Sequence, residues 1–224
     1  MPLWPEEQGV RVISVNVAMP QVVTMDGKDV PTGIFKQPVN GPVMLRPLNF
    51  DGDAQGDLQA HGGPDQAAYV YPWEHYAYWS RELGRPDMAP GQFGENLTIS
   101  GLSEDAVRIG DEFAIGEAVV MVSQPRTPCY KLAHKMGLPE FPKQFLASGR
   151  VGFYLRVVRA GVIAAGDPVA LVRSDPEAFT VRDLSRLRYF ERDDVEGFRR
   201  AAGMAALSEG WRKAFAEMAT RAKA

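Results

Sequence analysis

Cysteine is almost absent from this sequence: Cys129 is the single one among 224 residues. One cysteine cannot close a disulfide within the chain, which is typical of proteins in a reducing compartment, so we expect the cytoplasm. Iron–sulfur clusters generally need four thiolates, or two thiolates with two histidines, so the chain cannot supply the ligands for one. The low cysteine content therefore excludes a disulfide-stabilised fold and one large class of redox centre.

Other cofactor and membrane signatures are missing as well. The sequence contains no Gly-x-Gly-x-x-Gly after a strand, no Gly-x-x-x-x-Gly-Lys-Ser/Thr and no His-Glu-x-x-His. It has no run of eighteen apolar residues, and its first residues lack the pattern of a secretory signal. The net charge of −3 leaves no basic footprint for nucleic acid or an anionic membrane. We therefore expect neither partner, no pyridoxal phosphate, and an external protein as the electron source for any redox reaction.

The pattern of apolar, β-branched and turn-forming residues favours a mostly β fold with short helices. Segments of β-branched and apolar residues, broken by Gly, Pro and Asp, predict strands at 10–17, 42–48 and 67–71. Gly116-Glu117 predicts a hairpin between 113–115 and 118–123, and Ala160-Gly161 predicts a second pair, 152–158 with 162–172. A helix over 72–83 ends at Gly84, and weaker patterns indicate helices at 132–136 and 142–147. Strands at this spacing are typical of a barrel or a sandwich.

The character of the chain changes after Ser174-Asp175-Pro176. Thr180 and Asp183 form a capping-box pattern that begins one helix. Apolar residues at helical spacing indicate a second helix over 195–202 and a third from about 207 to 218. We therefore divide the chain into a β domain, 1–174, and a three-helix domain, 175–224. Three short helices are too small to be very stable alone, so they should pack together and against the β domain.

The most informative segment surrounds the cysteine and reads Gln124-Pro125-Arg126-Thr127-Pro128-Cys129-Tyr130-Lys131-Leu132. Its prolines fix their own φ angles and favour extended geometry in the preceding residues. Arg126 and Lys131 place a cation on each side of the sulfur, which favours the thiolate, the form that binds soft metals and attacks electrophiles. The alternative is a buried cysteine that only fills space in the core.

Two glycine-bearing loops are further candidates for a site. His61-Gly62-Gly63-Pro64-Asp65 lets backbone amides approach a ligand, and His61 and Asp65 could exchange protons or orient a substrate. Its alternative is a tight turn with an exposed histidine. Phe93-Gly94-Glu95-Asn96-Leu97 offers acceptors and an amide donor, with a hairpin turn as its alternative.

These motifs occur in an order that resembles one known family. The sequence is similar to MOSC-domain proteins, and specifically to the YiiM-like branch, through Gly52-Asp53-x-Gln55, His61-Gly62-Gly63-Pro64-Asp65, Tyr71-Pro72-x-Glu74-His75-Tyr76, Phe93-Gly94-Glu95-Asn96-Leu97, Gly110-Asp111 and the cysteine segment. The resemblance implies a MOSC-type β-barrel that binds the molybdenum cofactor, followed by a small three-helix C-terminal domain. It also implies reduction of N-hydroxylated compounds such as hydroxylaminopurines, and thereby detoxification of base analogues.

The resemblance further implies roles for individual residues. Cys129 corresponds to the family's thiolate ligand to molybdenum. The segment Pro31 to Lys36 resembles an early cofactor-contacting loop, and Gly94-Glu95-Asn96 corresponds to an Arg-Pro-Asn loop in related amidoxime-reducing enzymes, of which only Asn96 is retained. The expected cofactor-binding residues are Thr32, Gly33, Lys36, Asn96, Arg126 and Lys131, the cations acting through charge-assisted hydrogen bonds.

On this interpretation, His61 and Asp65 join Cys129 as the catalytic residues, delivering protons and orienting the substrate. The expected partners are a separate electron-donating reductase and a small N-hydroxylated substrate. The sequence is compatible with both a monomer and a homodimer. Two other functions are compatible with the same motifs. The chain could carry the molybdenum cofactor without turnover, or it could be an interaction module whose cysteine is merely buried.

Overall fold

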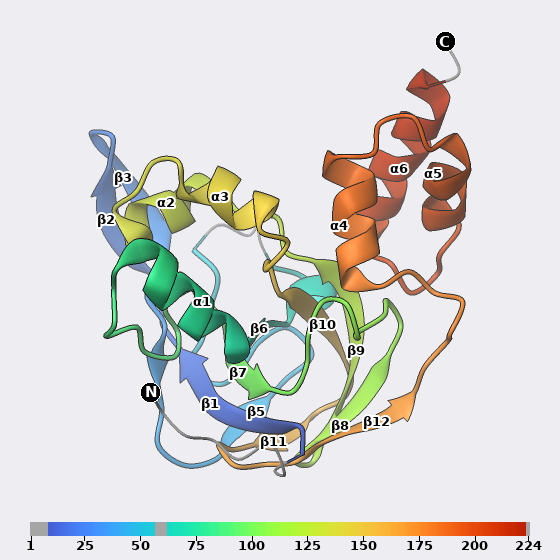
Figure 1. Cartoon of the computed structure of the whole chain (residues 1–224). Coiled ribbons are helices and arrows are strands. Elements are labelled where there is room, and N and C mark those ends of the chain that lie inside the picture. The colour runs from blue at the N-terminus through green and yellow to red at the C-terminus, as the bar shows by residue number, and fades with distance from the viewer. Residues whose placement is uncertain (1–8, 57–61, 223–224) are drawn as a thin grey trace.

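The computed structural model describes residues 9–56 and 62–222, and these form a sheet-rich body with a helical bundle at its C-terminal end (Figure 1). Its strands are β1 (Arg11–Val17), β2 (Gln21–Met25), β3 (Lys28–Thr32), β4 (Gln37–Pro38), β5 (Val43–Leu45), β6 (Ala68–Pro72), β7 (Leu97–Ser100), β8 (Glu112–Ile115), β9 (Ala118–Pro125), β10 (Phe153–Arg159), β11 (Gly161–Ile163) and β12 (Val169–Arg173). Its helices are the 3-10 turn η1 (Pro64–Gln66) and α1 (Glu74–Leu83), α2 (Tyr130–Met136), α3 (Phe141–Ala147), α4 (Val181–Tyr189), α5 (Val195–Ala202) and α6 (Glu209–Arg221). The predicted fold class is confirmed.

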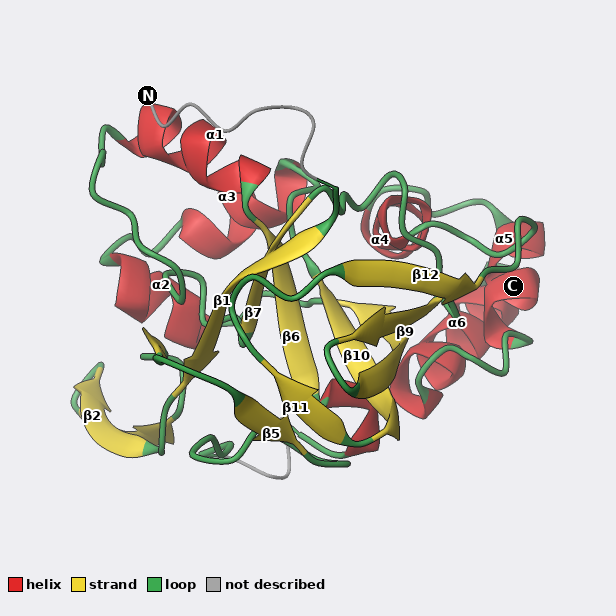
Figure 2. Cartoon of the chain, turned by 90° about the horizontal axis from the view of Figure 1, so that it is seen from below, coloured by secondary structure: helices red, strands yellow, loops and turns green. Residues whose placement is uncertain are grey.

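The main sheet closes on itself as a barrel. Its strand order is β12-β8-β9-β10-β6-β7-β1-β4, and β6 and β7 are its one parallel pair in the described residues. The N–H of Val12 donates to the carbonyl of Asp167 at 2.9 Å, and that of Val169 donates to Val10 at 2.9 Å. These bonds join the first strand to the segment that enters the last strand. The barrel wall is seen from below in Figure 2, with α1–α3 and α4–α6 outside it.

The predicted pairing of 152–158 with 162–172 is wrong. β10 pairs with β9 and β6, whereas β11 pairs with β5. The expected strand 162–172 is two strands, β11 and β12, because a turn interrupts it. The carboxylate of Asp167 accepts from the N–H of Ala164 at 2.8 Å, and Gly166 has a φ of 93°, which a side chain would disfavour. The hairpin between β8 and β9 is confirmed.

A hairpin that the sequence analysis missed positions one wall of the site. β2 and β3 pair in antiparallel register around Asp26-Gly27, whose φ angles are 50° and 75°. Asp-Gly is a strong two-residue hairpin signal because both positions need positive φ. The hairpin projects from the barrel in Figure 1, and β3 ends at Thr32.

The helices α1, α2 and α3 cover one side of the barrel through a second, aromatic-rich core. α1 begins at Glu74 rather than at Pro72, because Pro72 still belongs to β6. Leu132 and Met136, four residues apart on α2, are buried in this core. Its aromatic members include Tyr71, Trp79, Phe93, Phe141 and Phe145. This packing fixes α2, which directly follows the cysteine.

The three predicted C-terminal helices are present as α4, α5 and α6. Thr180 and Asp183 make the predicted capping box, and Asp194 and Ser208 cap the next two helices. Phe198, Leu207 and Phe215 are fully buried in the same apolar core as the barrel. The helices therefore pack against the β domain, as their size requires. Within residues 9–56 and 62–222, no helix is long and apolar enough to cross a lipid bilayer.

Candidate functional site

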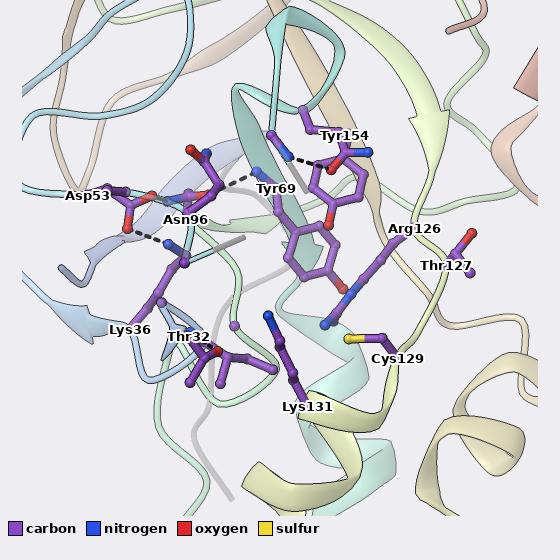
Figure 3. Close-up of a pocket in the computed structure, with 18 residues that line it drawn as sticks. Thr32, Lys36, Asp53, Tyr69, Asn96, Arg126, Thr127, Cys129, Lys131 and Tyr154 are labelled. Atoms are coloured by element: carbon purple, nitrogen blue, oxygen red, sulfur yellow. Dashed lines mark hydrogen bonds and ion pairs between the residues drawn. The ribbon is translucent and has the colours of Figure 1, made fainter. Parts of the chain in front are cut away.

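One cavity collects the cysteine and the residues predicted to bind a cofactor (Figure 3). It lies among the end of the β2–β3 hairpin, the loop that follows it, the Asp53 loop, the turn before β7 and the cysteine segment. The predicted residues that line it are Thr32, Gly33, Lys36, Asn96, Arg126, Cys129 and Lys131. They come from positions spread over about a hundred residues, and the barrel brings them to one place.

The cysteine stands where β9 passes into α2. β9 ends at Pro125, and Cys129 has extended backbone geometry (φ −128°, ψ 173°) immediately before α2 begins. Its side chain is half-buried and points toward the same space as those of Arg126 and Lys131. The Nζ of Lys131 also donates to the carbonyl of Pro31 at 3.3 Å, which joins α2 to the β2–β3 hairpin. The thiol is therefore held at a fixed point of the cavity wall.

Arg126 is the buried cation of the site. One of its guanidinium nitrogens donates to the carbonyl of Phe93 at 2.7 Å, and the group lies 4.5 Å from the centre of the Tyr69 ring. Burial acts to lower the pKa of Arg126, but interactions with Tyr69, Tyr154 and Cys129 outweigh it and hold the pKa above its ordinary value. Arg126 is therefore a permanent positive charge beside the thiol.

A second buried network holds the opposite wall. Lys36 makes an ion pair with Asp53, and Asp53 also accepts from the amide of Asn96 at 2.8 Å. Burial lowers the pKa of Lys36, and the pairing with Asp53 opposes that effect. The amide oxygen of Asn96 accepts from the N–H of Tyr69 at 3.1 Å. The oxygen and the nitrogen of the Asn96 amide thus both have protein partners, so the side chain holds the cavity wall together rather than donating to a ligand.

The electrostatic balance of the cavity differs from that of the whole chain. The described residues that line it include three cations, Lys36, Arg126 and Lys131, and one carboxylate, Asp53, which is already paired. Behind the wall, burial lowers the pKa of Lys135 to about 8, with Glu95 opposing and Arg126 and Lys36 adding to the shift. Cations crowded in a half-buried cavity favour an anionic ligand.

The predicted proton donors are placed differently from the cofactor residues. His61 lies outside the described residues. Asp65 belongs to η1, and its carboxylate pairs with Arg156, whose Nε donates at 2.7 Å. Asp65 does not line the cavity but lines a neighbouring groove on the other side of Cys129. Its role in proton delivery stays a prediction.

Several residues of the site escaped the sequence analysis. Asp53 was noted only as part of a motif, and Tyr69, Tyr154 and Lys135 were assigned no role. Tyr69 and Tyr154 lie on the paired strands β6 and β10, and their rings are 5.3 Å apart against the guanidinium of Arg126. Alternating aromatic residues on strands look like core in a sequence, so only the strand pairing reveals that they line a cavity.

Comparison with known families matches most of the chain in two adjacent segments. The MOSC domain matches residues 57–170, and the YiiM-like 3-alpha helix domain matches residues 179–218. The uncharacterized protein YflK of Bacillus subtilis is 43% identical over 210 residues, which cover 94% of this chain and 95% of that protein. Protein YiiM of Escherichia coli is 39% identical over 184 residues, 81% of each chain.

A more distant relative and a solved structure also match this chain. A protein named Reductase from Gibberella moniliformis is 33% identical over 164 residues, which cover 72% of this chain but 29% of that protein. The crystal structure of YiiM from Geobacillus stearothermophilus has a TM-score of 0.81 and 38% identity, with 94% of this chain and 99% of that chain covered.

Proposed function

The chain belongs to the MOSC-domain family and carries the YiiM-like three-helix domain, and on that premise we propose that it is a molybdenum-cofactor-dependent reductase of N-hydroxylated compounds. The observation that carries the proposal is the position of Cys129 in the wall of a cavity that Lys36, Arg126 and Lys131 also line. A relative named Reductase supports a redox function in general terms. The N-hydroxylated substrate rests on the family resemblance.

The residues of the cavity suit a group of this kind. The molybdenum cofactor is an anionic, phosphate-bearing pterin, and the lining presents three cations against one paired carboxylate. Beside the cavity the backbone at Gly33 lies so close to the carbonyl of Ala54 that a Cβ on Gly33 would collide with it. No three His, Cys, Asp or Glu side chains within residues 9–56 and 62–222 form a metal site. A metal at Cys129 would therefore need most of its ligands from a cofactor, as a dithiolene provides.

In this mechanism the protein supplies binding, charge and proton control. When bound, the cofactor would supply the two electrons that reduce the N–O bond. Cys129 provides the thiolate ligand, and the fixed charge of Arg126 stabilises that thiolate. Lys36 and Lys131, with Thr32 and Gly33 beside them, hold the polar head of the cofactor. Because Cys129 is half-buried, part of its thiol is shielded from bulk water.

The overall reaction converts R–NHOH, two electrons and two protons into R–NH2 and water. Asp65, which lines the groove beside Cys129, and His61 are the proposed source and path of the protons. The electrons come from a separate reductase, because the sequence has neither a dinucleotide motif nor the ligands of an iron–sulfur cluster.

The decisive experiment compares wild type with Cys129→Ala, both made in cells that synthesise the molybdenum cofactor. We expect the variant to fold and to lose both molybdenum, by elemental analysis, and N-hydroxyl reduction with reduced viologen as donor. Tyr130→Phe is the matched control, because this neighbour of Cys129 is exposed and does not line the cavity. A Cys129→Ala variant with wild-type metal content would refute the ligand role. Wild type that holds molybdenum but reduces no N-hydroxylated compound would instead be a cofactor carrier.

A further inference from the structure

A groove runs from the far side of Cys129 to the C-terminal helices. Barrel residues such as Asp65, Gln124 and Tyr154 form one wall, and Arg188, Ser208, Gly210 and Trp211 form the other. The groove shares five lining residues with the cofactor cavity, namely Gly62, Gln66, Thr127, Cys129 and Tyr154. The sulfur therefore stands between two hollows, one lined by the β domain alone and one lined by both domains.

The helical wall is held firmly to the cysteine segment. The hydroxyls of Thr127 and Tyr189 form a hydrogen bond of 2.8 Å, which links the residue two before Cys129 to the end of α4. The N–H of Ser208, just before α6, donates to the carbonyl of Ser123 on β9 at 3.1 Å. The helices are thus positioned relative to the sulfur by direct bonds as well as by the shared apolar core. A wall fixed in this way can select among ligands.

Arg188 is the unusual side chain of this wall. Its guanidinium carbon lies 4.4 Å from the centre of the Trp211 ring, so the planar group stacks over the indole. One of its terminal nitrogens is buried, and it has no hydrogen-bond partner among the described residues. A buried donor without a partner is costly, so a rotation of this half-buried side chain that brings the nitrogen to a ligand acceptor in the groove would be favourable. The carboxylate of Asp65 in the same groove is already paired with Arg156.

We propose that Arg188, supported by Trp211, is the substrate-recognition residue of this enzyme, and that the groove takes a flat heteroaromatic ring with an acceptor atom at its edge. The stacked guanidinium of Arg188 donates to a ring nitrogen or carbonyl oxygen, and the N-hydroxyl group of the substrate is directed toward Cys129. This inference rests on the proposed function for the chemistry at the sulfur. The groove and its unpartnered donor do not depend on it.

The space in the groove supports a ligand that lies across the helical wall. An added Cβ at Gly210 would meet nothing within 4 Å, so the start of α6 leaves the groove open at that point. A large side chain there would fill the groove without disturbing the packing beneath it. Gly210→Phe is therefore a second, independent way to block the site.

The first test measures binding without turnover, in the full-length protein. The probe is 2-aminopurine, a fluorescent heteroaromatic compound with acceptor ring nitrogens and no N–O bond to reduce. We expect Arg188→Ala and Gly210→Phe each to weaken its binding at least tenfold, as measured by fluorescence anisotropy. Arg192→Ala removes a cation that is exposed and lies outside this groove, and it should bind within twofold of wild type. Far-UV circular dichroism and thermal melting verify that each variant is folded.

The second test measures turnover with reduced viologen. Arg188→Ala should raise the KM for 6-hydroxylaminopurine at least tenfold with kcat within twofold, and should leave turnover of hydroxylamine, which is too small to reach Arg188, unchanged. Arg188→Lys keeps the charge but loses the planar group over Trp211, so its KM for 6-hydroxylaminopurine should lie between those of wild type and Arg188→Ala.

The outcomes separate this inference from the proposed function. Equal binding of 2-aminopurine by wild type, Arg188→Ala and Gly210→Phe would overturn it, as would an equal loss with both substrates. If Arg188→Ala does not fold, Gly210→Phe and Arg188→Lys replace it: weakened binding of 2-aminopurine supports the inference, and binding equal to wild type overturns it. Arg188-dependent binding by a protein without molybdenum would uphold the groove and refute the reductase.

Discussion

The turn before β7 is predicted to depend on the buried carboxylate of Glu95. Its Oε1 accepts from the N–H of Gly91 at 2.7 Å, from the hydroxyl of Thr98 at 2.9 Å and from the hydroxyl of Tyr76. Its Oε2 accepts from the N–H of Phe93 at 3.0 Å. The side chain is completely buried, so water replaces none of these bonds. Four donors that converge on one acceptor favour a carboxylate over an amide.

The structure gives a magnitude for Glu95→Gln. The amide oxygen can take the place of Oε1 and keep three donors, but each bond to a charged acceptor becomes a neutral one, at about 1 kcal/mol each. The amide NH2 would then face the N–H of Phe93, and an unsatisfied buried donor costs about 1–3 kcal/mol. The total is about 4–6 kcal/mol, which for a chain of this size lowers the Tm by at least about 8 °C. Tyr76→Phe removes one donor and should cost less, about 1–2 kcal/mol.

Urea unfolding followed by circular dichroism measures these differences. Glu217→Gln on the exposed face of α6 is the matched control and should stay within about 0.5 kcal/mol of wild type. Because Gly94 and Asn96 flank Glu95 and line the cavity, the variant should also lose molybdenum. A Glu95→Gln protein as stable as wild type would refute the reasoning, since the four bonds could not then depend on the charge.

Further predictions follow from single observations. Burial lowers the pKa of Lys135 from 10.5 to about 8, so between these pH values the unfolded chain binds more protons and the stability of the folded chain rises with pH. In urea unfolding, the stability of wild type relative to Lys135→Met should increase by about 2–3 kcal/mol between pH 7 and 10. A difference independent of pH would contradict this. Deleting the residues after 174 should leave the cofactor cavity complete but expose barrel core, so the product should melt lower or aggregate yet bind molybdenum when soluble; a well-folded truncation without molybdenum would disprove it. His61→Ala should retain molybdenum and lose turnover in the viologen assay, and normal turnover would remove His61 from the mechanism. NADH alone should support no reduction by the purified protein, and steady turnover without added reductase would show this to be wrong.

Local signals in the sequence predicted much of this molecule. The cysteine segment, the capping box at Thr180 and the hairpin at Gly116 are all encoded within a few neighbouring residues. The missed hairpin at Asp26-Gly27 carries an equally strong local signal, so it too could be predicted from the sequence. The cofactor residues were located through the family resemblance, and the structure places all of those it describes around one cavity.

Other features depend on long-range pairing and could not be predicted in the same way. Lys36 meets Asp53, and Asp53 meets Asn96, only because separate loops end at one rim of the barrel. β11 leaves β10 to pair with β5, a choice that no local pattern indicates. No local pattern links Trp211 to Arg188, and only the packing of α4 and α6 places the two in one groove with Cys129.

The closure of the barrel has a consequence for how the chain is made. Val12 leaves the ribosome early but cannot complete its pairing until Asp167 and Val169 have emerged. At about 5–20 residues per second, the roughly 155 residues between Val12 and Asp167 take about 10–30 s to synthesise. During that interval β1 can pair with β7, and its last residues can pair with β4, but the edge of its first residues around Val12 is open, which is a template for other strands. Aggregation during synthesis should therefore be most sensitive to translation rate across the second half of the β domain, because pausing there prolongs the life of the open sheet.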